Sequence, residues 1–246
     1  MLQAITKLAS LRNFYFFCGK LLPWFAWPTL ILMLVGLYWG LVEAPADYQQ
    51  KDSYRIIFIH VPAAWMSLFV YMVMAMSAAA SLIWKTKASE VVANSCAPVG
   101  AAFTFLALAT GSLWGKPMWG TWWEWDARLT SELVLLFLYL GYMALQSAFE
   151  DKRTAARATA ILAIVGVVNI PIIHYSVEWW FTLHQGPTVQ VLKGKQAMDT
   201  SMLIPLMIMA TAFKFYFVTV LLMFSRNEVL ERESHTKWVQ EERERL

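Results

Sequence analysis

Six long apolar runs separated by short polar segments dominate the hydropathy pattern of the chain. A helix needs about 20 predominantly apolar residues to cross the hydrocarbon core of a bilayer. The pattern therefore predicts an all-α, polytopic protein with six transmembrane helices in a single integral membrane domain, residues 1–246. The predicted spans cover approximately residues 22–42, 61–84, 91–114, 127–149, 155–176 and 202–225.

The segments at the two ends of the chain differ from these runs. Residues 1–21 carry Lys7, Arg12 and Lys20 among Leu, Phe and Tyr, which predicts an amphipathic segment on the bilayer surface. Residues 226–246 mix both charges and predict a solvated tail. Lys and Arg are concentrated near both termini and in the turns around 85–87 and 150–157. The positive-inside tendency therefore places both termini in the cytoplasm.

Composition supports a membrane protein and excludes other classes. Hydrophobic residues make up 59% of the chain, charged residues only 15%, and the mean hydropathy is +0.48. A soluble domain typically carries about 25% charged residues. The net charge of +3 lies mostly in short loops, which indicates topology and argues against a nucleic-acid partner. The lipid bilayer is the partner that this composition predicts.

The predicted outward segment between the third and fourth spans is unusually rich in tryptophan. Five of them occur within residues 114–125: Trp114, Trp119, Trp122, Trp123 and Trp125. An aromatic belt at the membrane interface explains one or two tryptophans at a helix end. Pro117 suits a first helical position, and the spacing of the residues after it predicts a short amphipathic surface helix. Such a face favours a platform for a large planar ligand, with membrane anchoring as the alternative.

Three of the four histidines fall at or near the predicted outer face, and two of them flank the tryptophan-rich segment. His60 precedes the second span, and His184 lies in the last outward loop. His174 is near the outer end of the fifth span, and His235 lies in the tail. A single interfacial histidine is most simply a hydrogen-bonded residue, but a flanking pair favours metal ligation. Haem iron takes one or two axial imidazoles.

Several charged residues have two interpretations that the sequence leaves open. Arg55 and Arg128 lie at outward helix ends, where they either snorkel or bind the carboxylates of an anionic ligand. Asp126 either caps the helix that begins at Ala127 or fixes the loop geometry. Lys214 lies in the middle of the sixth span, where a charge is costly unless it faces protein or water, and it receives no specific role.

The segment Trp119-Gly120-Thr121-Trp122-Trp123-Glu124-Trp125-Asp126 resembles the tryptophan-rich signature of the haem-handling membrane proteins of bacterial cytochrome c maturation. The length, the six spans and one outward histidine on each side of the signature are similar to the haem exporter protein C family. The resemblance covers essentially the whole chain.

This resemblance implies a site and a set of partners. His60 and His184 would be axial ligands of haem b, bound as cargo, with the signature tryptophans, Trp114, Asp126, Arg55 and Arg128 around it. The site would face the periplasm from the bacterial inner membrane. The implied partners are a periplasmic haem chaperone, an ATP-binding-cassette ATPase with its membrane subunit, and a small single-span protein. The chain contains no phosphate-binding Gly-x-x-x-x-Gly-Lys-[Ser/Thr] loop, so ATP hydrolysis would belong to a partner and we expect no enzyme activity.

Two other functions remain as alternatives. A membrane b-type haem electron carrier would hold haem between intramembrane histidines, a position that only His174 approaches. A small-solute transporter would place polar groups near mid-membrane, where Lys214 alone offers support. Bound haem would exclude the transporter, and redox cycling by a quinol would favour the electron carrier.

Overall fold

The computed structural model describes residues 10–184, 189–190, 195–196 and 198–245. Six helical segments in these residues are long and apolar enough to cross a membrane, which confirms the predicted number of spans. Their bounds are Leu11–Glu43, Asp52–Trp84, Lys87–Trp119, Ala127–Ser147, Lys152–Trp179 and Thr200–Arg232.

Each span is built from one or two regular elements. The first two contain α2 (Leu11–Tyr38), a π-helical turn η1 (Trp39–Glu43), a 3₁₀ turn η2 (Asp52–Ile56) and α3 (Ile57–Trp84). The next are α4 (Lys87–Trp119), α5 (Ala127–Ser147), α6 (Lys152–Gly166) and α7 (Asn169–Trp179). The short strands β1 (Val189–Gln190) and β2 (Lys195–Gln196) pair antiparallel before α8 (Thr200–Arg232) and α9 (Lys237–Arg243).

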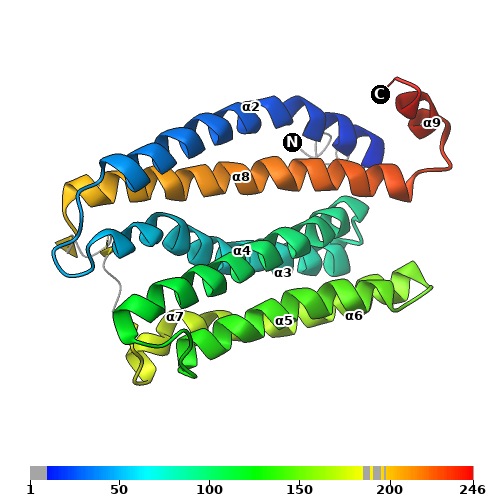
Figure 1. Cartoon of the computed structure of the whole chain (residues 1–246). Helices are drawn as coiled ribbons and strands as arrows, with labels where there is room; N and C mark the ends of the chain where they lie inside the picture. Colours follow the sequence, from blue (N-terminus) through cyan, green and yellow to red (C-terminus); the bar gives the residue numbers. More distant parts are fainter. Residues whose placement is uncertain (1–9, 185–188, 191–194, 197, 246) are drawn as a thin grey trace.

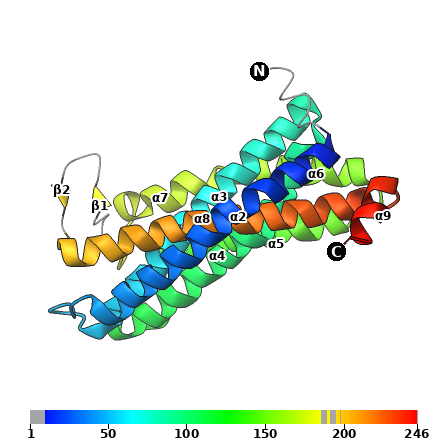
Figure 2. The ribbon, with the colours of Figure 1, turned by 90° about the horizontal axis from the view of Figure 1, so that it is seen from above.

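The helices form three layers (Figure 1). The first membrane helix, α2, packs along the last one, α8, although they are distant in sequence. The antiparallel pair α3 and α4 forms the middle layer, and α5 with α6 and α7 forms the third. Figure 2 shows α2 crossing over α8 when the bundle is seen from above. We call the end with η2, residues 120–126 and residues 180–184 the histidine end.

Buried tyrosines hold the middle and third layers together. Tyr139 is fully buried and donates from its hydroxyl to the Ser67 carbonyl at 2.8 Å, which links α5 to α3. A Cβ added at Gly100 would collide with the Tyr139 ring, and one added at Gly166 would collide with the Tyr71 hydroxyl. Small residues let helices approach closely in membranes. These two glycines therefore make room for the tyrosines that bridge the layers.

Two boundaries differ from the prediction at the termini. Helix α2 already begins at Leu11, so residues 11–21 are its first turns and not a separate surface segment. Residues 1–9 lie outside the described part of the chain. In the first turns of α2, Tyr15 is buried and accepts a hydrogen bond of 2.8 Å from Arg226 of α8. This packing explains the correction, and α8 likewise continues to Arg232 beyond the predicted end at 225.

Two further boundaries matter for the site. Helix α3 begins at Ile57, so His60 lies inside its first turn and does not precede the helix as predicted. The fifth span, predicted as one helix over 155–176, is divided into α6 and α7 at Val167–Val168. Asn169 begins α7 and donates from its side chain to the Ser131 carbonyl at 2.9 Å, which ties the break to α5.

Candidate functional site

The tryptophan-rich segment does not form the predicted surface helix. Helix α4 runs through Pro117 to Trp119 and ends at Gly120, whose φ of 77° is left-handed. The Gly120 amide donates to the Lys116 carbonyl at 3.1 Å, a helix-ending geometry that glycine adopts without steric cost. Residues 121–126 are not helical. The prediction of a short helix is therefore wrong, because the spacing was assigned to a new helix when Trp119 belongs to the preceding one.

His60 is held by a hydrogen bond that fixes its tautomer. Its Nδ1 lies 3.1 Å from Thr110 Oγ1 on α4. The Thr110 hydroxyl has one proton, which it donates to the Leu106 carbonyl at 2.6 Å. Thr110 must therefore accept from His60 Nδ1–H. In the neutral imidazole this leaves Nε2 unprotonated, with a lone pair free for a metal.

Two residues of α4 pack around the same imidazole. The Trp114 ring meets the His60 ring edge-on, with centroids 5.6 Å apart. Trp114 Nε1 in turn donates to Gln50 Oε1 at 2.9 Å. A Cβ at Gly111 would lie 3.0 Å from His60 Cε1, so only glycine fits without displacing the ring. His60 is therefore fixed on two helices at once.

His184 is held by a loop and not by a helix. Its Nδ1 lies 3.0 Å from Asp126 Oδ2, and its backbone amide donates to Thr182 Oγ1 at 3.1 Å. The Thr182 hydroxyl donates its own proton to Asp126 Oδ2. Asp126 is also the N-cap of α5 and accepts from the Leu129 amide at 2.8 Å. The two interpretations of Asp126 are thus both realised in the structure: it caps the helix and fixes the loop.

The Asp126 carboxylate is electrostatically suited to orient an imidazole. Burial by itself would raise the pKa of Asp126, but the hydrogen bonds from His184, Thr182 and the Leu129 amide outweigh it and lower the pKa to about 2. The carboxylate therefore stays ionised at neutral pH and accepts from His184 Nδ1–H. In the neutral imidazole this arrangement leaves Nε2 unprotonated, as in histidine ligands oriented by a carboxylate. The Trp119 ring lies edge-on to His184, with centroids 4.8 Å apart.

The fold brings the two histidines and one arginine together. His60 lies within electrostatic range of both His184 and Arg128. Arg128 is the second residue of α5, is half-buried, and lies two residues after the Asp126 cap. Two imidazoles with free Nε2 atoms and one cation therefore converge at the histidine end, from α3, α5 and the loop after α7.

The remaining tryptophans of the segment make no described ring contact with a histidine, and Trp122 and Trp125 are exposed. Trp122 is 55% exposed, with the Lys116 ammonium 5.8 Å from its ring centroid. Trp123 and Trp125 contact each other edge-on at 5.4 Å, and Trp125 is 74% exposed. Only Trp114 and Trp119 form ring contacts with a histidine in the described residues. The predicted five-tryptophan platform is thus divided into an inner pair and an outer group of three.

Arg55 and His174 do not belong to the group formed by His60, His184 and Arg128. The Arg55 guanidinium pairs with Asp52 at 3.1 Å and donates to the Gly40 carbonyl at 3.2 Å, which ties η2 to η1. His174 is exposed on α7, and its described ring contact is with Tyr175 at 4.7 Å. Tyr175 stacks on Trp179 at 5.3 Å and 22°, which continues this outward-facing aromatic surface.

Sequence reasoning missed four polar residues around this site. Thr110, Thr182 and Gln50 each hold a histidine or a tryptophan, and no sequence pattern marks them as different from other polar residues. Glu132 is 7% exposed, one helical turn after Arg128, and its Oε1 has no hydrogen-bond partner among the described residues. An acid inside an apolar run is a recognisable signal of function, and it could have been found.

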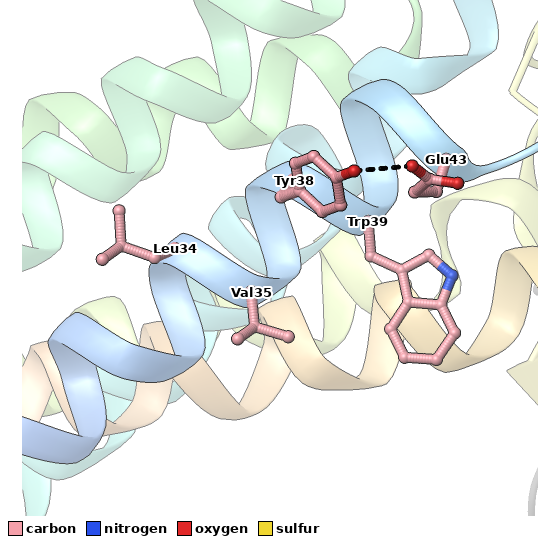
Figure 3. A pocket seen from close by; sticks show the side chains of 5 residues that line it. All are labelled: Leu34, Val35, Tyr38, Trp39 and Glu43. Carbon is pink, nitrogen blue, oxygen red and sulfur yellow. Dashed lines mark hydrogen bonds between the residues drawn. The ribbon is translucent and has the colours of Figure 1, made fainter.

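Two described cavities lie away from the histidines. One of about 540 Å³ is an open groove on the outer side of α2 and η1, where Tyr38 donates to Glu43 at 2.7 Å (Figure 3). Its lining residues are Leu34, Val35, Tyr38, Trp39 and Glu43. The other, of about 350 Å³, is lined by apolar side chains of α2, α4 and α8. Neither is lined by a histidine.

These features define a class of protein: a multi-pass helical membrane protein with paired imidazoles and tryptophans at one end. The family model described as CcmC, Heme exporter protein C, matches residues 4–240. The chain is 51% identical over 241 residues to Heme exporter protein C of Escherichia coli K12, covering 98% of this chain and 97% of the relative.

Other relatives extend this similarity. Heme exporter protein C of Bradyrhizobium diazoefficiens is 52% identical over 230 residues, covering 94% of this chain and 87% of the relative. A ccmC-like mitochondrial protein of Marchantia polymorpha, described for cytochrome c biosynthesis, is 42% identical over 210 residues, covering 83% of this chain and 87% of the relative. The chain belongs to the haem exporter protein C family.

Proposed function

We propose that this chain binds haem b as cargo at the histidine end, with Nε2 of His60 and Nε2 of His184 as the axial ligands. The observation that carries the proposal is that the Nδ1 atom of each histidine lies within hydrogen-bond distance of an oxygen. Thr110 accepts from one Nδ1–H and Asp126 from the other, so both Nε2 lone pairs are available. Haem iron with two axial imidazoles needs this tautomer on both sides.

The surrounding residues supply the other contacts that haem requires. Trp114 and Trp119, each against one histidine, offer apolar faces close to the iron ligands. Trp122, Trp123 and Trp125 would extend this surface outward. Arg128 carries a cation within electrostatic range of His60 and would bind a propionate. Arg55 is engaged with Asp52 and the Gly40 carbonyl, so it would reach a propionate only by giving up that pair.

The family and the arrangement of the spans support a role in delivery. Relatives are named for haem export and for cytochrome c biosynthesis, which supports a role of this chain in maturation of c-type cytochromes. The distribution of Lys and Arg supports cytoplasmic termini and a periplasmic histidine end in the bacterial inner membrane. From there haem would pass to a periplasmic haem chaperone. An ATPase, its membrane subunit and a small single-span protein would complete the assembly.

The test compares histidine variants of the purified full chain. His60→Ala and His184→Ala are expected to lose most co-purifying haem and to abolish or sharply reduce c-type cytochrome formation in cells. His174→Ala is the matched control, because this histidine is exposed at the same end but contacts neither ligand candidate. Membrane abundance of each variant is measured in parallel, so that loss of insertion is separated from loss of haem.

The outcome that would overturn the proposal is normal haem content and normal maturation in both single variants. Loss of haem in His174→Ala alone would place the ligand on α7 and contradict the assignment. Redox cycling of the bound haem by a quinol would instead favour an electron carrier.

A further inference from the structure

Lys214 is a charged residue in the middle of a membrane-spanning helix. It lies within α8, which contains 33 residues from Thr200 to Arg232. At 1.5 Å per residue it is about 21 Å from the start of the helix and about 27 Å from its end. Its side chain is exposed on the surface of the described bundle, and no described residue pairs with its ammonium.

The other faces of α8 are already occupied. Helices α2, α3 and α4 pack against it. Their contacts include the Thr29–Thr219 hydroxyl pair at 3.1 Å, the Phe69–Phe217 ring pair at 6.0 Å and the Phe103–Phe213 ring pair at 5.6 Å. Met207, Thr211, Lys214 and Val218 follow helical spacing along the remaining face. Met207 and Lys214 are exposed and the other two are half-exposed, so this face is open along several turns. We call these four residues the lysine face.

An ammonium exposed to lipid at this depth is unfavourable. Charged side chains at the bilayer centre cost several kcal/mol and usually face protein or a water-filled cavity. Snorkelling to the interface serves lysines near helix ends. The apolar run around Lys214 extends for about 16 Å or more in both directions along the helix. This distance is too long for the ammonium to reach the membrane interface by snorkelling. Thr211 carries no charge to balance the ammonium, and its hydroxyl donates its proton to the Met207 carbonyl at 2.8 Å.

We propose that the lysine face docks a transmembrane helix of another membrane protein, one that carries an Asp or Glu at mid-membrane depth. The argument is charge complementarity, because a buried ammonium requires an anion and the lysine face has room for a helix. A second copy of this chain does not meet the requirement. Glu132 is the one acidic residue inside the six apolar runs of the sequence, and its side chain is buried between the layers.

The proposal concerns assembly and is independent of haem ligation. One experiment can therefore distinguish a failure of the docking proposal from a failure of the proposed haem-binding function. The tagged full chain is purified from native membranes in mild detergent, and the co-purifying membrane proteins and the haem per chain are both quantified. Lys214→Met and Lys214→Arg are compared with Lys152→Met, which removes an exposed lysine at the start of α6, outside the apolar runs.

Lys214→Met is expected to reduce recovery of one specific transmembrane partner about tenfold or more, while haem per chain stays normal. Lys214→Arg and Lys152→Met should recover the partner at the wild-type level. Lys214→Glu should lose the partner, and a carboxylate-to-lysine change in a transmembrane segment of that partner should restore it. Restored recovery of the partner after both charges are exchanged is the result that supports an ion pair most directly.

Three results would overturn the proposal. Wild-type recovery with Lys214→Met would show that the ammonium contributes nothing to assembly. Cross-linking of Lys214→Cys to a second copy of this chain would show that the lysine face binds this chain and not another membrane protein. Failure of every carboxylate-to-lysine exchange in the lost partner to rescue Lys214→Glu would exclude an ion pair.

Discussion

His60 and His184 reach the same site from opposite kinds of structure. His60 lies in the first turn of a long helix, and α4 holds its ring through Thr110 and Trp114. His184 lies in a loop after α7, held by a carboxylate and a hydroxyl. A side chain on packed helices is positioned more rigidly than one on a loop. On the proposed function, His60 is the fixed ligand and His184 the releasable one.

This difference matters for a protein that must both hold and release its cargo. The hydrogen bonds among Asp126, Thr182 and His184 form a local unit that does not include a residue of α3 or α4. Opening would remove one axial ligand and leave the other in place. Changes on the His184 side should therefore affect haem retention more strongly than matched changes on the His60 side.

The largest effect is expected at Asp126. Asp126→Ala removes both the carboxylate that orients His184 and the N-cap of α5. Losing a partner of this kind typically costs 10–100-fold in metal affinity, and losing the cap costs about 1 kcal/mol. We expect haem affinity to fall within roughly that range, as measured by haem titration of the purified chain.

Asp126→Asn separates these two roles. Asn caps helices about as well as Asp, so Asp126→Asn should lose less thermal stability than Asp126→Ala while haem affinity still falls. Loss of affinity and stability in Asp126→Ala, with neither loss in Asp126→Asn, would show that the residue acts only as a cap.

A smaller effect is expected at Thr110, on the His60 side. Thr110→Val removes the acceptor for His60 Nδ1–H and keeps the shape, while α3 and Trp114 still hold the ring. Haem affinity should fall less than in Asp126→Ala, and Thr110→Ser should restore it. A larger loss in Thr110→Val than in Asp126→Ala would reverse the assignment of fixed and releasable ligands.

The inner and outer tryptophans should also differ, by a smaller margin. Trp119→Phe removes part of an aromatic contact with His184, and such contacts contribute about 0.5–1.5 kcal/mol beyond buried area. Trp122→Phe should be nearly silent in haem affinity, because Trp122 contacts neither histidine in the described residues. If both changes reduce membrane abundance and leave haem per molecule unchanged, the tryptophans are membrane anchors.

The smallest effect is expected from pH. The pKa of Asp126 is depressed to about 2 from its ordinary value of 3.8. A carboxyl group whose pKa is depressed in the folded state stabilises that state at pH values above the ordinary pKa. This stabilisation is lost as the pH falls through the pKa of the folded state. Asp126 should therefore cause no change in thermal stability between about pH 5 and 8, and a loss below about pH 4 that Asp126→Asn lacks. An equal acid loss in both proteins would contradict this assignment.

The sequence predicted the spans well, for physical reasons. Apolar length and charged turns define membrane helices almost independently of tertiary contacts, so five predicted runs lie within single described spans, and only 127–149 exceeds its span, by two residues. The family signature selected His60 and His184. Spacing alone misassigned Trp119, because α4 continues through Pro117 until the left-handed Gly120 ends it. The supporting hydroxyls of Thr110 and Thr182 depend on neighbours that are distant in sequence, which no local pattern encodes.

The central claim is ligation of one iron by both imidazoles, and electron paramagnetic resonance of the ferric haem in the purified chain tests it most directly. The account predicts a low-spin, two-imidazole signal in the wild type. Each of His60→Ala and His184→Ala should convert any remaining haem to a high-spin form, and added imidazole should restore the low-spin signal. A high-spin wild type, or an unchanged low-spin signal in either variant, would contradict the account.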